Sequence, residues 1–252
     1  MLLDNSFPIT INSRKKLSMK DNIDSKNIGN RKLVLELRFE PKVILLDKKG
    51  EIVERILSTK VIPSNHWEIG QSEIVIRDNR IKEEAQNIVS ISLNRLSYIC
   101  YNVGTVASFY ANFEKIRDVV SSVLGDLTIS RIGCRIIGTY FSNTKDFKSL
   151  LENFKNCFPS QFLLENYPAK DFLFNLVYNN GMYQIGPVSD DDGFYSREFP
   201  LSSCRKHVGI AIDTDNYLTN DVKSINDKSL IKDVYTLSLS VEKDLFVKLS
   251  TL

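Results

Sequence analysis

The stretch Leu33-Val34-Leu35-Glu36-Leu37-Arg38-Phe39 indicates most clearly what kind of fold this chain adopts. Its apolar residues occupy alternate positions, with Glu36 and Arg38 on the other side, and this period of two is typical of a strand with one buried face. Further short apolar runs follow at residues 74–76, 88–93, 96–101, 129–141 and 207–213. We therefore expect a chain built largely from half-buried strands.

Three segments repeat their apolar residues every three or four positions, which is typical of amphipathic helices. They are residues 109–124, 145–157 and 230–249. Gly125 is suited to end the first helix in a left-handed conformation, and Pro159 to stop the second. Asp227 or Ser229 can cap the start of the last.

Turn residues predict how the strands connect. Asp47-Lys48-Lys49-Gly50 lies between two apolar runs within residues 43–57, and Asn179-Asn180-Gly181 lies between two within residues 172–185. Both patterns predict hairpins. Because hairpins outnumber the long crossovers that parallel strands need, the sequence predicts an α+β fold. We expect mostly antiparallel sheets with about three amphipathic helices, the last at the C-terminus.

The polarity of the segments and the spacing of their apolar residues divide the chain into three parts. Residues 1–31 form a polar N-terminal arm, residues 32–104 a strand-rich half, and residues 105–252 a mixed α+β half. The two halves could also form one continuous domain. The cysteines are widely spaced and lack a Cys-x-x-Cys pair, so we expect reduced thiols and no zinc site.

Composition and charge exclude several classes of protein. The 252 residues carry 33 Lys+Arg against 31 Asp+Glu, a net charge of +2, and 42% are hydrophobic. These values exclude a disordered chain, and a dedicated binder of nucleic-acid backbone would show a larger basic excess. No apolar run approaches the roughly 20 residues that cross a bilayer, and the N-terminus lacks the pattern of a secretory signal. We therefore expect a cytoplasmic protein with no membrane partner.

Several short motifs carry a family resemblance. They are Glu36-Leu37-Arg38-Phe39, Arg131-Ile132-Gly133-Cys134-Arg135 and the late strand that ends in Asp213-Thr214-Asp215. With them, residues 30–252 resemble a sporadically distributed prokaryotic family of uncharacterised proteins that has an Arg-Ile-Gly-apolar-Arg strand. The resemblance implies no established activity. Some members look like accessory genes near phage-defence or mobile elements, which implies a role in antiviral defence.

Two acidic segments are candidates for a metal site. Asp213 and Asp215 stand two positions apart on a strand, so both point to one face and could share a divalent cation. Asp190 and Asp192 alternate in an acidic loop before Gly193 and could add ligands if the segments met. We favour the simpler interpretation, in which the first pair ends a strand and the second lies in a solvated turn.

Candidate contact residues are basic or aromatic, namely Arg131, Arg135, Arg205, Lys206 and Trp67. Arg131 and Arg135 share one strand face around a glycine, where they could hold a phosphate or carboxylate, or pair with acidic neighbours. Arg205 and Lys206 form a basic cluster that could meet nucleic acid or an acidic partner. Trp67 could anchor an interface or fill the rim of the core.

The sequence contains few residue patterns that are typical of a catalytic site. It has no Gly-x-Ser-x-Gly elbow, Walker A loop or Rossmann glycine pattern, and nothing orients Cys204 toward His207. We expect a non-catalytic cytosolic binding protein, a subunit or sensor that contacts another protein and needs no cofactor. Two alternatives stay open. One is a metal-dependent hydrolase or nuclease with a divalent cation on the acidic segments. The other is a nucleic-acid-binding module built on Arg131, Arg135, Arg205 and Lys206.

Overall fold

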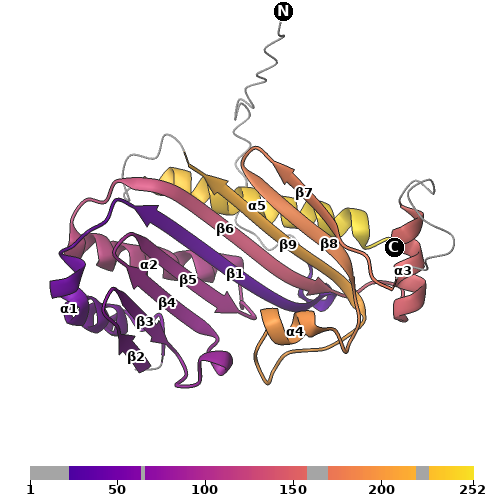
Figure 1. Ribbon diagram of the computed structural model, residues 1–252, viewed down its shortest axis with the longest axis horizontal. Coiled ribbons are helices and arrows are strands. Elements are labelled where there is room, and N and C mark those ends of the chain that lie inside the picture. The colour runs from indigo at the N-terminus through magenta and orange to yellow at the C-terminus, as the bar shows by residue number, and fades with distance from the viewer. Residues whose placement is uncertain (1–22, 64–65, 158–169, 220–226) are drawn as a thin grey trace, which may run out of the picture.

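The computed structural model describes residues 23–63, 66–157, 170–219 and 227–252. Its strands are β1 (Ile28–Phe39), β2 (His66–Ile69), β3 (Glu73–Arg77), β4 (Asn87–Ser92), β5 (Arg95–Tyr101), β6 (Ile129–Tyr140), β7 (Phe174–Tyr178), β8 (Gly181–Val188) and β9 (Gly209–Leu218). Its α-helices are α1 (Leu45–Ser58), α2 (Val106–Leu124), α3 (Phe147–Asn156), α4 (Gly193–Glu198) and α5 (Lys228–Leu249). The nine strands form one antiparallel sheet in the order β2-β3-β4-β5-β1-β6-β9-β8-β7 (Figure 1). The predicted α+β class with an antiparallel sheet and a C-terminal helix is confirmed.

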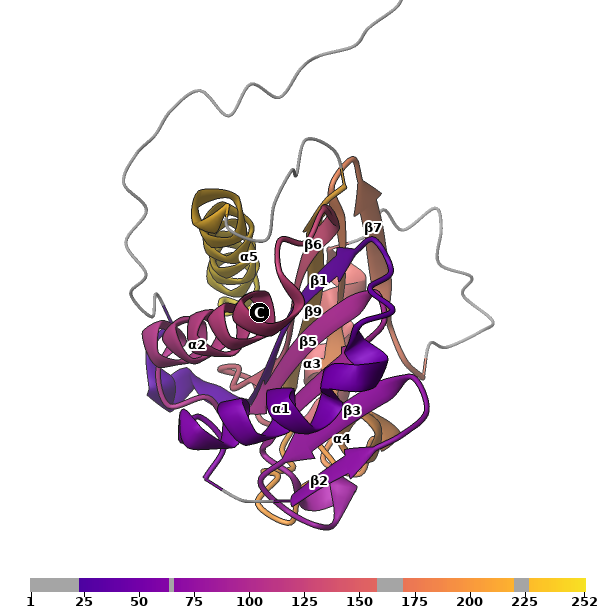
Figure 2. The same ribbon diagram turned by 90° about the vertical axis from the view of Figure 1, so that its left-hand side faces the viewer.

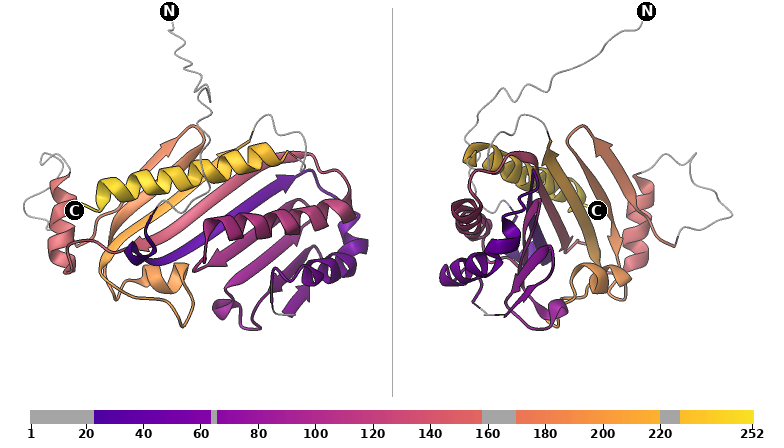
Figure 3. Two further views of the ribbon diagram at one scale, coloured as in Figure 1. Left: turned by 180° about the vertical axis from the view of Figure 1, so that it is seen from behind. Right: turned by 60° about the vertical axis from the view of Figure 1, so that its left-hand side comes forward.

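The order of elements repeats once along the chain. In the first half, the long strand β1 and the helix α1 precede strands β2 to β5 and the helix α2. In the second half, the long strand β6 and the helix α3 precede strands β7 to β9 and the helix α5, with the short helix α4 between β8 and β9. The two long strands pair in the middle of the sheet, with Leu35 opposite Cys134, and each half adds its other strands outward in reverse chain order. Seen from behind, α2 and α5 cross the same face of the sheet (Figure 3). The sheet is thus built from two similar halves around an approximate twofold axis.

The boundary between the two halves of the repeat lies at residues 125–128, between α2 and β6. The sequence pattern instead predicts a boundary after residue 104. All nine strands share one sheet, so the predicted domain division stays a prediction. Residues 1–22 of the predicted arm lie outside the described residues, and β1 already begins at Ile28.

One face of the sheet carries the main core. Leu33, Leu35 and Leu37 of β1 are fully buried beneath the helices, as the alternating pattern predicts. Burying each of these side chains contributes about 1.5–3 kcal/mol relative to exposing it. Figure 2 shows α1, α2 and α5 on this side of the sheet. The opposite face of β1 therefore presents its polar residues.

The predicted hairpin at residues 43–57 is wrong, because this segment forms α1. One side of α1 is buried and carries Leu45, Ile52, Val53 and Ile56. The turn-like residues before Ile52 obscure this helical period in the sequence. Gly50 lies inside the helix with nothing within 4 Å of the position where a Cβ would stand, so it marks no turn. The other predicted hairpin is confirmed as β7 and β8.

Helix boundaries follow most of the expected signals. Gly125 ends α2 with a φ of 78°, and the Asp227 side chain accepts a hydrogen bond from the Leu230 amide at the start of α5. Asp146 caps α3, and the predicted stop at Pro159 lies outside the described residues. The apolar period of residues 230–249 predicts that Leu230, Val234 and Leu237 share the buried side of α5. Leu237 is instead 45% exposed, so the buried side is rotated from this prediction.

A buried ion pair explains this rotation of α5. Arg31 of β1 donates a hydrogen bond to the Glu242 carboxylate on α5, and the Tyr140 hydroxyl of β6 donates to the same carboxylate. These residues are 5%, 1% and 0% exposed. Glu242 faces the sheet because its charge has partners there, and a buried carboxylate without partners would be costly. The pair fixes α5 over the junction of the two halves.

Candidate binding face of the sheet

The face opposite the core is covered at one end. There α4 and the loop that follows it pack Tyr195, Phe199 and Leu201 onto the sheet around Ile137. Figure 1 shows α4 in front of the strands at the lower edge. The Lys32 ammonium of β1 donates to the Glu198 carboxylate of α4 over 2.8 Å, which attaches the cover to the sheet. The neighbouring part of this face is open.

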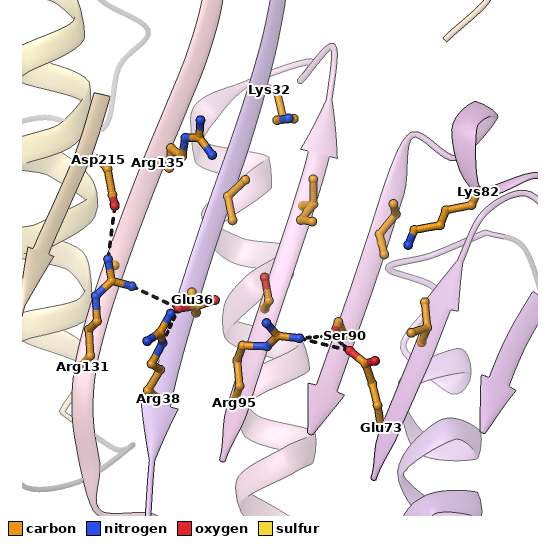
Figure 4. A pocket seen from close by; sticks show the side chains of 16 residues that line it. Lys32, Glu36, Arg38, Glu73, Lys82, Ser90, Arg95, Arg131, Arg135 and Asp215 are labelled. Carbon is orange, nitrogen blue, oxygen red and sulfur yellow. Dashed lines mark hydrogen bonds and ion pairs between the residues drawn. The ribbon is translucent and has the colours of Figure 1, made fainter. Parts of the chain in front are cut away.

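A hollow lies beside the cover, across β3, β4, β5, β1, β6 and β9 (Figure 4). Six basic side chains line it, namely Lys32, Arg38, Lys82, Arg95, Arg131 and Arg135. Three acidic side chains line it as well, namely Glu36, Glu73 and Asp215. Apolar side chains form part of its floor, namely Val34, Val75, Ile88 and Ile99. The lining therefore carries more positive than negative charge.

Three of these arginines lie abreast on neighbouring strands. Arg38 on β1 stands directly opposite Arg95 on β5 and opposite Arg131 on β6. We name Arg95, Arg38 and Arg131 the arginine row. Like charges directly opposite each other destabilise a sheet, so the row requires counter-charges nearby.

Arg131 is held in one orientation by four neighbours. Its Nη1 donates to Glu36 Oε1 over 3.1 Å, and its Nη2 donates to Asp215 Oδ2 over 3.3 Å. The guanidinium lies over the Tyr217 ring, 5.0 Å from its centroid. It also covers Gly133, where a Cβ would come within 2.6 Å of Nη1. The absence of a side chain at Gly133 therefore makes room for the Arg131 guanidinium.

The other two arginines of the row keep more contact with solvent. Arg38 Nε donates to the same Glu36 oxygen over 2.8 Å, and the Arg38 side chain is 53% exposed. Arg95 Nη2 donates to Glu73 Oε1 over 3.1 Å, and both side chains are about two-fifths exposed, at 40% and 42%. Ser90 donates to the same Glu73 oxygen. Three carboxylates, Glu36, Glu73 and Asp215, thus serve as the counter-charges of the row.

Asp213 and Asp215 are both paired with arginines. Arg135 donates twice to Asp213, over 2.9 and 2.7 Å, and this bond raises the pKa of the guanidinium. Burial raises the pKa of the Asp215 carboxyl, although Arg131 and Arg135 oppose this effect. The two carboxylates share one face as predicted, but they orient guanidinium groups there.

The acidic loop has a structural role in the fold. Asp192 caps α4 by accepting a hydrogen bond from the Phe194 amide over 2.7 Å, and Asp190 is exposed. Within the described ranges, no group of three or more His, Cys, Asp or Glu side chains could hold a metal ion. The proposed metal site on Asp190, Asp192, Asp213 and Asp215 therefore gains no support and stays a prediction.

The remaining predicted contact residues lie away from the arginine row. Arg205 and Lys206 are exposed, and the backbone of Arg205 is fixed to the Asn30 side chain by hydrogen bonds of 2.8 and 2.9 Å. Trp67 lies on the edge strand β2, opposite the buried Ile76 and hence on the side of the helices, with 44% of it exposed. The structure brings together only Arg131 and Arg135 of the predicted contacts.

Arg38, Arg95, Glu73 and Lys82 are part of this face that sequence reasoning missed. Alternation alone places Arg38 on the polar side of its strand. The register that sets it beside Arg95 and Arg131 depends on pairing between strands distant in the sequence.

Potential nucleophiles are poorly placed for catalysis. Burial raises the pKa of the Cys100 and Cys134 thiols to about 12 in each case, and it also raises the pKa of Cys204. Burial lowers the pKa of His207, whose ring packs 4.3 Å from the Phe141 ring, centroid to centroid. A thiol with a raised pKa holds little thiolate at neutral pH.

No family model and no curated protein matches this chain. The resemblance to a sporadic prokaryotic family therefore stays a prediction. No helix in the described part of the chain is long and apolar enough to cross a membrane.

Proposed function

We propose that the protein is a non-catalytic binding protein, a subunit or sensor that contacts another protein through the open face around the arginine row. We place it in the cytoplasm because the sequence lacks a secretory signal pattern and a membrane-spanning run, and in a prokaryotic phage-defence system because of the family resemblance. An antiparallel sheet can face water on one side, so an open face alone is ordinary. The arginine row on that face carries the proposal.

The row is an arrangement that a purely structural sheet would avoid. Arg38 has an arginine opposite it on both neighbouring strands, and such pairs cost stability. Glu36, Asp215 and Tyr217 nevertheless hold Arg131 in a fixed orientation. Arginine in a fixed orientation is well suited to contacts at protein interfaces, because its planar group offers several donors.

Hydrolysis by a metal-dependent enzyme is less well supported. Asp213 and Asp215, the carboxylates that would carry it, are bonded to Arg135 and Arg131. A cation at this place would have to displace both guanidinium groups.

Nucleic-acid binding is the second candidate, because the lining of the hollow has twice as many basic as acidic side chains. Against it, the lining contains no aromatic ring on which a base could stack. Glu36, Glu73 and Asp215 would also repel a phosphate backbone. The mixed charge of the face is better suited to a protein surface.

A photo-crosslinking residue at Ser90, in the hollow, tests the proposed function. The matched control places the same residue at Lys115, which is exposed on α2 on the other face. In cells of the source organism, we expect Ser90 to crosslink to one protein and Lys115 not to do so. Equal crosslinking from both positions, or none from Ser90, would contradict the proposal, and crosslinks to nucleic acid would support the second candidate.

A further inference from the structure

We propose that the arginine row and Lys82 bind the carboxylates of an acidic segment of the partner protein. This inference rests on the proposed function, since it specifies the chemistry of the partner at the same face. It starts from two exposed cationic side chains of the hollow, Arg38 and Lys82.

The row has as many carboxylates as arginines, but one of them is shared. A single oxygen of Glu36 accepts hydrogen bonds from both Arg38 and Arg131. Lys82 lines the same hollow, is exposed, and forms no ion pair within the described part of the chain (Figure 4). An incoming carboxylate would therefore find an exposed ammonium and the exposed Arg38 guanidinium, which shares its counter-charge with Arg131.

Donor groups remain for such a ligand. Among the described residues, Arg38 bonds only through Nε, so both of its terminal nitrogens can donate to a carboxylate in the two-bond geometry that guanidinium groups favour. Neighbouring strands are about 4.8 Å apart, so the three strands of the row span about 10 Å. Side chains two apart in an extended peptide project to one side about 7 Å from each other, so two acidic residues fit within this span.

The floor of the hollow favours a peptide over a nucleic acid or a small acid. Val34, Ile99 and Ile88 face one another on neighbouring strands, four residues along β1 and β5 from Arg38 and Arg95, and offer apolar contact at the other end of the hollow. A segment with acidic side chains at one end and apolar side chains at the other could use both features, whereas a phosphate backbone has no apolar groups for this floor. A small dicarboxylate would reach the arginines but gain little from the floor.

The full chain can be tested with a fluorescent octapeptide of four Glu followed by four Val. We expect binding that weakens as salt rises, because exposed charge pairs are screened. Arg38→Gln and Lys82→Gln should each weaken binding, with a loss of about tenfold for Arg38→Gln, the size expected for one charged hydrogen bond. The matched control is Arg55→Gln on α1, whose side chain is 50% exposed on the other side of the sheet.

Circular dichroism and urea midpoints verify that each variant is folded. An unchanged affinity in folded Arg38→Gln, or tighter binding of a Lys-Val peptide, would overturn the inference. So would tighter binding of an oligothymidine, or succinate competing as strongly as the peptide.

The crosslinked partner supplies a second measurement. Mass spectrometry of the peptide joined to position 90 should identify a segment rich in Asp and Glu, and a neutral or basic segment would overturn the inference while the proposed function stands. If the acidic peptide binds but Ser90 crosslinks to no protein, the proposed function fails instead.

Discussion

Replacing Glu242 with leucine is expected to lower the free energy of unfolding by about 3 kcal/mol. The change removes the Glu242 carboxylate, to which the Arg31 guanidinium and the Tyr140 hydroxyl both donate, and the Arg31 side chain is 6% exposed. Breaking a buried ion pair by removing one partner costs about 3–5 kcal/mol. The new leucine recovers part of this cost through apolar burial, since position 242 is 1% exposed.

Urea and thermal unfolding, followed by circular dichroism, measure this loss. For a chain of this size, about 3 kcal/mol corresponds to a fall in melting temperature of about 9 °C. Adding Arg31→Met to Glu242→Leu should restore at least half of the loss, because apolar pairs often replace buried ion pairs at little cost. The control Glu51→Leu, at a half-exposed ion pair on α1, should change stability by less than about 1 kcal/mol.

A loss below about 1 kcal/mol in Glu242→Leu would show that the buried ion pair does not stabilise the fold as expected. A double variant no more stable than the single one would show that the buried charge of Arg31 is not the cause of the loss.

Three further outcomes follow from single residues. Gly50→Ala should raise the free energy of unfolding by about 0.5–1 kcal/mol, because alanine suits the interior of α1, and a loss in urea unfolding would contradict this. Burial holds the pKa of His207 below 6.5, so the stability it contributes is present above pH 6.5 and is lost as the pH falls below that value. His207→Gln should therefore flatten the fall in urea midpoint between about pH 7 and about pH 5, and equal slopes would count against it. In the native protein, a thiol reagent should label the exposed Cys157 but not the fully buried Cys134, and equal rates would contradict the burial of Cys134.

The sequence was sufficient for the class of the fold because its clearest patterns are local. The alternation in β1 and the helical period of α2 each depend on neighbouring residues only, and both are confirmed. The hairpin predicted around Gly50 was wrong because the charged residues and the glycine resemble a turn. The apolar residues that define α1 lie further apart in the sequence. The buried side of α5 could not be predicted by hydrophobicity, because Glu242 faces the sheet through its ion pair.

The candidate site was predictable only in part. The pattern placed Arg131 and Arg135 on one face, and both line the hollow. It could not show that Gly133 accommodates Arg131, or that Arg38 completes a row with Arg95, because these contacts depend on the register between strands. Local periodicity contains no information about that register.

The doubled architecture affects what pieces of the chain would do. Cut between α2 and β6, either fragment would expose a bare strand of 12 residues, β1 or β6, with its backbone groups unpaired along one side. Such an edge readily recruits another strand. Since β1 and β6 already meet in antiparallel orientation, two copies of one fragment could join in the same way and rebuild a continuous sheet. In the intact protein, the covalent link between the halves makes β1 pair with β6 of the same chain, so the continuous sheet forms within one molecule.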